Sequence, residues 1–286
     1  MIDFTGNDSG VSAKKADASK IYSQNTLDTY KRECCAFARW AKATAAERGE
    51  KMPHTIDDIR KYAGDYLRRT KADGSNYSAF TLKTERAAIA KLYGVRCRDI
   101  SADLPVRHRA GITRSRGVST ADKHYNPKNY PDVEALGRGA GLRRGDISRL
   151  HGRDVIERPD GLHLRIDIGK GGKSRDILVL PQYADAIREL AARTAPDERL
   201  IPRGKVPKAL DEHAYRREYV REMYALVARD TTTLTKRERI HTRGDAKGLV
   251  FDRAAVAFVS RQLGHGSLKN GVWRDRTNVV VEHYLV

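Results

Sequence analysis

The sequence predicts a mainly helical α+β protein, with a helical first half and a second half in which helices accompany a small antiparallel sheet. Three observations lead to this fold class. Apolar residues recur at spacings of three and four through most of the chain, one short stretch alternates with a period of two, and the composition changes between residues 104 and 130. A chain of 286 residues is long enough for two domains with a core each.

The charge of the chain points to a polyanionic partner. The formal net charge is +18, from 55 Lys and Arg against 37 Asp and Glu. Nucleic acid is the first candidate for such a field, and a membrane surface is the second. The sequence has no apolar run that would span a bilayer and no signal-peptide pattern, so we expect a soluble intracellular protein without membrane contact.

The three cysteines indicate neither a zinc site nor disulfides. Cys34, Cys35 and Cys97 include no Cys-x-x-Cys pair, and adjacent cysteines on one helix point in different directions. Free thiols in a reducing compartment are therefore expected.

The first half of the chain is expected to be a helical domain that follows a short arm. Residues 1–20 are small and polar without an apolar period, which favours a flexible arm, whereas residues 21–103 carry three amphipathic stretches. The predicted helices are 25–48, a second that begins at the capping box of Thr55 and Asp58, and 78–93.

Residues 104–125 are expected to form a basic linker that contacts DNA between the domains, because they are rich in Pro, Gly, Ser, Thr and cations. Cations also line the polar sides of the predicted helices, where ordinary solubility or a phosphate backbone would explain them equally. The cations predicted to bind DNA are Lys83, Arg86, Arg107, Arg109, Arg114 and Arg116.

Residues 126–286 are expected to form the second domain, with an insertion of loops and a short hairpin at about 225–250. A turn at 169–173 joins two predicted strands and places Lys170 at a hairpin tip. The predicted elements are a short helix at 143–146, strands at 162–168 and 176–180, and helices at 182–195, 211–224 and 253–263.

Two glycine-rich stretches fail the nucleotide-binding motifs that they approach. The run 169–174 ends like a P-loop, but position 167, where the leading glycine belongs, is Asp. Gly137, Gly139 and Gly141 are followed by Leu at 142 and are preceded by no predicted strand, so they fail the dinucleotide fingerprint. We expect no cofactor and no metal.

The stretch 211–224 combines a polar pair with a buried stripe. His213 and Arg216 are three residues apart, so they share one helical face. The stripe that would press this helix into a core consists of Tyr215, Tyr219, Val220 and Met223.

Taken in order, a set of short motifs in the second half resembles the tyrosine recombinase (phage integrase) family. The motifs are Gly-Leu-Arg143, Gly-Lys170-Gly, His213-Ala-Tyr-Arg216, Leu-Gly-His265 and Tyr284. The resemblance covers residue 126 to the end, and the helical first half suits the core-binding domain of that family. It implies a two-domain, C-shaped clamp on DNA.

The resemblance also implies a chemistry for these residues. Cutting one DNA strand without a metal needs a nucleophile, a site for the charge of a phosphorane, and a proton for the departing oxygen. Arg143 and Arg216 would hold the phosphate oxygens, because a guanidinium is planar and always charged. Tyr284 would attack the phosphorus and form a 3′-phosphotyrosine, which conserves the phosphodiester energy, so that rejoining needs no ATP.

The remaining residues take assisting roles by the same resemblance. Lys170 would protonate the leaving 5′-oxygen, which an ammonium can do and a guanidinium cannot. His213 and His265 would bond the phosphate or help to move the tyrosine proton. Asp146 resembles the acidic residue that orients the first arginine.

Two spacings depart from the family pattern. His265 and Tyr284 are 19 residues apart, about twice the family's distance, and the segment 225–250 stretches the path from Arg216 to His265. The pair His241-Thr-Arg243 lies at a more usual distance from His265. It lacks the i, i+3 spacing and the apolar stripe, and therefore ranks below His213 and Arg216.

The resemblance implies that the chain would be an integrase or transposase of a mobile genetic element, in the prokaryotic cytosol at the nucleoid. It would cut and rejoin double-stranded DNA at inverted-repeat core sites as a homotetramer, with accessory DNA-bending proteins as further partners. One alternative is a type IB topoisomerase, which has a similar catalytic set. The other is a DNA-binding protein with a decayed catalytic site.

Overall fold

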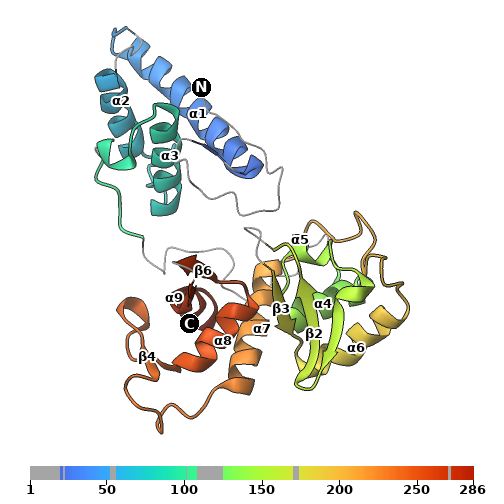
Figure 1. Ribbon diagram of the computed structural model, residues 1–286. Coiled ribbons are helices and arrows are strands. Elements are labelled where there is room, and N and C mark those ends of the chain that lie inside the picture. Colours follow the sequence, from blue (N-terminus) through green and yellow to red (C-terminus); the bar gives the residue numbers. More distant parts are fainter. Residues whose placement is uncertain are drawn as a thin grey trace. The chain divides into compact units, whose positions relative to one another are not determined.

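The structure is a computed structural model (Figure 1) that describes residues 20–21, 23–51, 56–100, 102–107, 125–169, 174–269 and 272–286. Residues 1–19 of the predicted arm and 108–124 of the predicted linker lie outside these ranges. The chain divides into two compact units, 1–112 and 113–286. Among the described residues, no helix is both long enough and apolar enough to cross a membrane.

The described part of the first unit contains a bundle of three helices, each of which contacts the other two. The helices are α1 (Gln24–Glu47), α2 (Ile56–Arg68) and α3 (Ala79–Leu92), followed by a 3-10 turn, Cys97–Asp99. Their apolar faces meet in a core around Phe37, Tyr66 and Ile89. The Ser78 hydroxyl caps α3 by accepting a hydrogen bond from the Thr81 amide at 3.1 Å. The three predicted helices of this half are confirmed, and Thr55 of the predicted capping box lies outside the described residues.

A buried ion pair joins the end of α2 to α3. Arg69 donates to both carboxylate oxygens of Glu85, at 3.0 and 2.7 Å, and the Glu85 side chain is 3% exposed. The Arg69 guanidinium also lies over two aromatic rings, 3.5 Å from the centroid of Tyr66 and 4.1 Å from that of Tyr77. This pair is therefore shielded from water on several sides.

The second unit packs helices around a small antiparallel sheet, so the predicted α+β fold class is confirmed. The strands β1, β2 and β3 pair in that order, and α6 packs against β1 and β2 while α8 packs against β3. The described elements are α4 (Pro131–Ala140), α5 (Arg144–Ile147), β1 (Val155–Arg158), β2 (Gly161–Ile166), β3 (Arg175–Leu178), α6 (Pro181–Ala192), α7 (Glu212–Val227), β4 (Arg239–His241), β5 (Val250–Asp252), α8 (Arg253–Gln262), β6 (Gly266–Lys269), β7 (Val272–Asp275), α9 (Thr277–Val280) and a π-helical turn (Val281–Leu285).

The predicted strands and helices of this half are present, with shifted ends. The strand predicted at 176–180 is β3, which begins one residue earlier than predicted and ends at Leu178. It ends early because Pro181, whose φ is fixed, starts α6. The stripe of α7 is buried as expected, with Tyr219 and Val220 fully covered. The sequence did not predict β1, α4 or the β6–β7 hairpin.

The glycines that approach a dinucleotide motif serve packing instead. They lie in and after α4, where three tyrosines press against the backbone. A Cβ on Gly137 would lie 2.8 Å from the Tyr215 ring, and one on Gly139 would lie 2.7 Å from Tyr183. Gly141 ends α4 with a φ of +56°, and a Cβ on it would lie 2.7 Å from the Tyr219 side chain. Small residues here let α4 sit close to α6 and α7.

Candidate active site

The carboxylate of Asp146 is surrounded by the guanidinium groups of several arginines. Asp146 lies on α5, its side chain is 1% exposed, and its Oδ2 is 2.9 Å from Nη2 of Arg175 and 3.8 Å from Nη1 of Arg143. Its Oδ1 accepts from Nη2 of Arg149 at 3.1 Å. One carboxylate thus shares its charge among several arginines, which orients them and leaves an excess of positive charge.

Arg216 is held by backbone carbonyl groups. It is 1% exposed, and its guanidinium donates to the carbonyl of Gly141 and, at 3.2 Å, to that of Leu263. These two carbonyls belong to the turn before Arg143 and the turn before His265. Arg216 therefore ties both segments to α7 while its own charge meets no carboxylate of the described residues.

His265 and Tyr284 face each other across a short gap. The imidazole Nε2 is 3.3 Å from the phenol Oη, and the ring centroids are 5.7 Å apart. Tyr284 is 7% exposed within the π-helical turn, and its carbonyl accepts from Nε of Arg221 at 3.2 Å. A base and a hydroxyl at this separation are arranged for proton transfer.

The electrostatics of the site favour a bound anion and a neutral imidazole. Burial, followed by the charge of Arg216, lowers the pKa of Arg143 to about 10. Burial, followed by the charges of Arg216, Arg143 and Arg175, lowers the pKa of His265 to about 3. With this pKa a neutral His265 is a weak base. An anion placed among the guanidinium groups would offset their charges and raise that pKa, so that Nε2 could then accept the proton of Tyr284.

The two long spacings in the sequence are closed by local pairing. Between His265 and Tyr284 the chain forms the β6–β7 hairpin, in which Gly266 pairs with Asp275 and the Arg276 amide donates to the His265 carbonyl at 3.1 Å. The segment 225–250 holds β4, which pairs with β5. Its ends meet where Arg229 donates to the buried Asp252, at 2.9 Å.

Of the residues predicted for the site, His213 is not joined to it by the described contacts, and Lys170 is not among the described residues. His213 lies on α7, but its side chain is 61% exposed and its nearest ionic partner is Glu212 at 4.0 Å. No hydrogen bond or ion pair among the described residues joins it to Arg216 or Tyr284. Lys170 lies outside the described residues, between β2 and β3.

The sequence reasoning missed Arg175. Its side chain is 7% exposed, and it connects the start of β3 to Asp146 and, through Nε, to the carbonyl of Gln262 at 3.0 Å. The Gln262 side chain accepts from the Leu178 amide at 2.7 Å, so α8 is fastened to β3 twice. A signal was present, because Arg175 has the same strand parity as the buried Ile177 and therefore faces inward.

The predicted DNA-binding cations that are described lie in the first unit. Lys83 and Arg86 are half-buried on α3, and the exposed Arg107 lies over the Phe80 ring at 4.9 Å. Arg109, Arg114 and Arg116 lie outside the described residues. Across the described part of the chain, no group of three or more His, Cys, Asp or Glu side chains could hold a metal ion.

Comparisons with known proteins add a distant likeness. No protein-family model and no curated protein matches the chain. The crystal structure of XerA recombinase is similar at 13% identity and a TM-score of 0.32, over 92% of this chain and 88% of that chain. A likeness of this size says nothing about a reaction, which has to be argued from the side chains.

Proposed function

We propose that the chain is a tyrosine site-specific recombinase, which cuts and rejoins DNA strands through a 3′-phosphotyrosine. The observation that carries this proposal is the Tyr284 hydroxyl 3.3 Å from the neutral His265, in a cluster with the half-buried guanidinium of Arg143 and the buried guanidinium of Arg216. A nucleophile, a base and fixed positive charges are the parts that strand transfer needs.

The proposed reaction moves two protons, one from the attacking oxygen of Tyr284 and one to the leaving 5′-oxygen. The Tyr284 oxygen attacks and passes its proton to Nε2 of His265, while Arg143 and Arg216 hold the non-bridging oxygens. The bond from phosphorus to the 5′-oxygen breaks, and Lys170 is proposed to protonate that oxygen. Attack by a 5′-hydroxyl of a partner strand reverses these steps. His213, exposed at the start of α7, is proposed to close on the phosphate when DNA binds.

The partners follow from the same proposal. Strand exchange joins two duplexes, so a homotetramer on inverted-repeat sites is proposed, with the cations of the first unit and of the linker on the phosphate backbone. A mobile genetic element in a prokaryotic cytosol is the proposed setting, with accessory DNA-bending proteins as further partners. The formal net charge of +18 supports a DNA ligand.

Trapping the covalent intermediate tests the proposal. A pool of nicked duplexes of random sequence releases a short fragment after cleavage, so the protein–DNA adduct cannot reverse and survives detergent. The wild type and Tyr130→Phe, a control tyrosine stacked on Tyr125 in the same unit, should form the adduct, and Tyr284→Phe should form none. No adduct with the wild type, or an adduct that persists in Tyr284→Phe, overturns the proposal.

Sequences recovered from the adduct then separate recombination from topoisomerase activity. A plasmid that carries two copies of the recovered sequence should be recombined. Relaxation of supercoils without recombination would assign the chain to the type IB topoisomerases instead.

A further inference from the structure

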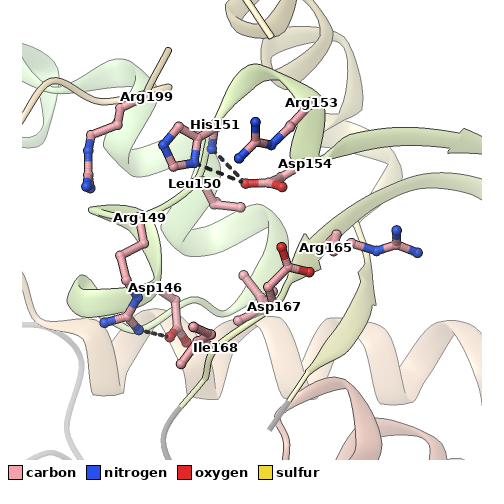
Figure 2. A pocket seen from close by; sticks show the side chains of 11 residues that line it. Asp146, Arg149, Leu150, His151, Arg153, Asp154, Arg165, Asp167, Ile168 and Arg199 are labelled. Carbon is pink, nitrogen blue, oxygen red and sulfur yellow. Dashed lines mark hydrogen bonds and ion pairs between the residues drawn. The ribbon is translucent and has the colours of Figure 1, made fainter. Parts of the chain in front are cut away.

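A pocket of about 220 Å³ opens on the second unit beside the candidate active site (Figure 2). It lies between α5, the turn that follows α5 and the end of β2. Its lining carries the arginines Arg149, Arg153, Arg165 and Arg199 and the carboxylates Asp146, Asp154 and Asp167. The proposed reaction uses none of the arginines of this lining.

The pocket and the candidate active site share the carboxylate of Asp146. On the pocket side Oδ1 accepts from Arg149 at 3.1 Å, and on the other side Oδ2 faces Arg175 at 2.9 Å and Arg143 at 3.8 Å. Figure 2 shows Arg149 bonded to Asp146, with Arg199 on the same side of the pocket in this view. The pocket arginine Arg149 and the catalytic candidate Arg143 therefore both lie beside the carboxylate of Asp146.

Among the described residues, the Arg149 and Arg199 side of the pocket has no carboxylate ion-pair partner other than Asp146, whereas Asp167 lines the pocket just after β2. Arg199 donates to the carbonyl of Ser148, and no carboxylate of the described residues forms an ion pair with it. Asp154 is mostly turned inward, because it is 8% exposed and accepts from the His151 amide at 2.8 Å. The guanidinium groups that depend on the one carboxylate of Asp146, or on carbonyls, are Arg143, Arg149, Arg175, Arg199 and Arg216.

We propose that Arg149 and Arg199 bind a phosphodiester of the DNA backbone next to the one that is cleaved. This proposal rests on the proposed function, because it takes DNA as the ligand. Guanidinium forks match phosphate oxygens, and the Arg149 side chain is 52% exposed, so it can turn to a ligand while Asp146 keeps its other partners. A second phosphate held here fixes the position of the strand relative to Tyr284, since backbone contacts set register.

The salt dependence of DNA binding tests the site without requiring cleavage. Each phosphate contact that is lost should lower the slope of log K against log salt by about 0.9. We would measure fluorescence anisotropy of a labelled duplex with Tyr284→Phe protein, between roughly 50 and 200 mM salt. Because both arginines bind the same phosphate, Arg199→Gln and Arg149→Gln should each reduce the magnitude of the slope by part of this amount and weaken binding several-fold at the lower salt, and the double variant should reduce it by about 0.9.

Arg188→Gln is the matched control. Arg188 is an exposed arginine of α6 that already pairs with Asp185, at 2.7 Å, and with Glu157, so its loss should leave the slope unchanged. An equal fall in slope for Arg188→Gln would mean that DNA responds to the overall positive charge rather than to this pocket, and it would overturn the proposed site. An unchanged slope for Arg199→Gln, which leaves the ion pairs of Asp146 intact, would also overturn it.

Two further outcomes keep this proposal apart from the proposed function. If Arg199→Gln weakens inorganic phosphate binding but leaves the DNA slope unchanged, the pocket takes a small anion only and the assignment to DNA is wrong. If the slopes fall as expected but no covalent adduct forms in the trapping experiment, the pocket stands and the proposed reaction fails.

Discussion

The Nε2 atom of His265 lies 3.3 Å from the hydroxyl of Tyr284, although 19 residues separate them. The β6–β7 hairpin accounts for the distance in sequence, because it leaves the site after His265 and returns at Arg276, whose amide bonds the His265 carbonyl. An antiparallel hairpin begins and ends at one place, so its length does not change the geometry at its base. A spacing in the sequence is therefore a poor measure of a spacing in this site.

The neutral state of His265 predicts a loss of stability in acid. Burial and the surrounding guanidinium groups lower its pKa to about 3, whereas an unfolded histidine titrates near pH 6.5. The stability is therefore complete above about pH 6.5 and is lost as the pH falls towards 3, because the unfolded state binds the proton first. Between pH 7 and 5 the wild type should lose about 2 kcal/mol more than His265→Gln in urea unfolding.

His213→Gln is the control for this measurement, because it removes an exposed imidazole that the described contacts do not join to the cluster. It should lose as much stability between these pH values as the wild type does. Equal losses for the wild type and His265→Gln would contradict the prediction.

A lysine in place of Arg143 should make adduct formation sensitive to pH. Burial and Arg216 lower the pKa of the Arg143 guanidinium to about 10, which still leaves it charged at neutral pH. An ammonium starts from a lower pKa, near 10.4, and the same surroundings would move it towards neutrality. The adduct yield of Arg143→Lys should therefore fall as the pH rises from about 6 to 9.

Two comparisons complete that experiment. The wild type should show no such fall, and Arg143→Ala should form no adduct while its DNA affinity stays within a few-fold, because binding is spread over many phosphates. A flat pH profile for Arg143→Lys, or an equal loss of binding and cleavage in Arg143→Ala, would show that the charge of this residue is not what the site requires.

Strong helical periods could be predicted from the sequence, and residues placed by pairing could not. The stripe of α7 predicted the inward direction of Tyr219, whereas the i, i+3 spacing of His213 and Arg216 did not predict that Arg216 is buried while the His213 side chain is 61% exposed. The β6–β7 hairpin was missed although the dipeptide Asn-Gly at 270–271 is a strong hairpin signal. Arg175 was missed because its role depends on Asp146 and Gln262, which are distant in sequence.

Arg175 is predicted to be a positioning residue. It holds Asp146 and the carbonyl of Gln262 with different nitrogens, so a lysine can keep one of these partners at a time. Arg175→Gln should slow adduct formation at least about tenfold with little change in DNA affinity, and Arg175→Lys should recover part of the rate.

A purely structural role for Arg175 would leave the titration of His265 unchanged. Because the charge of Arg175 contributes to lowering the pKa of His265, that pKa should rise in Arg175→Gln when it is followed by NMR. Arg188→Gln, which removes an exposed arginine of α6 paired with Asp185, is the control and should change neither the rate nor this titration. A slow Arg175→Gln enzyme with an unmoved His265 titration would reduce Arg175 to a packing residue.

Breaking the Arg69–Glu85 pair should destabilise the first unit. Removing one partner leaves the other charge buried, so Arg69→Met should lower the free energy of unfolding by about 3 kcal/mol. Trp40, which lies 5.3 Å from Tyr66 between ring centroids, reports this in a Trp273→Phe background. The double variant Arg69→Met/Glu85→Met should recover part of the loss, because no charge remains buried. A double variant no more stable than Arg69→Met would mean that packing over the two tyrosine rings, rather than the ion pair, holds α2 to α3.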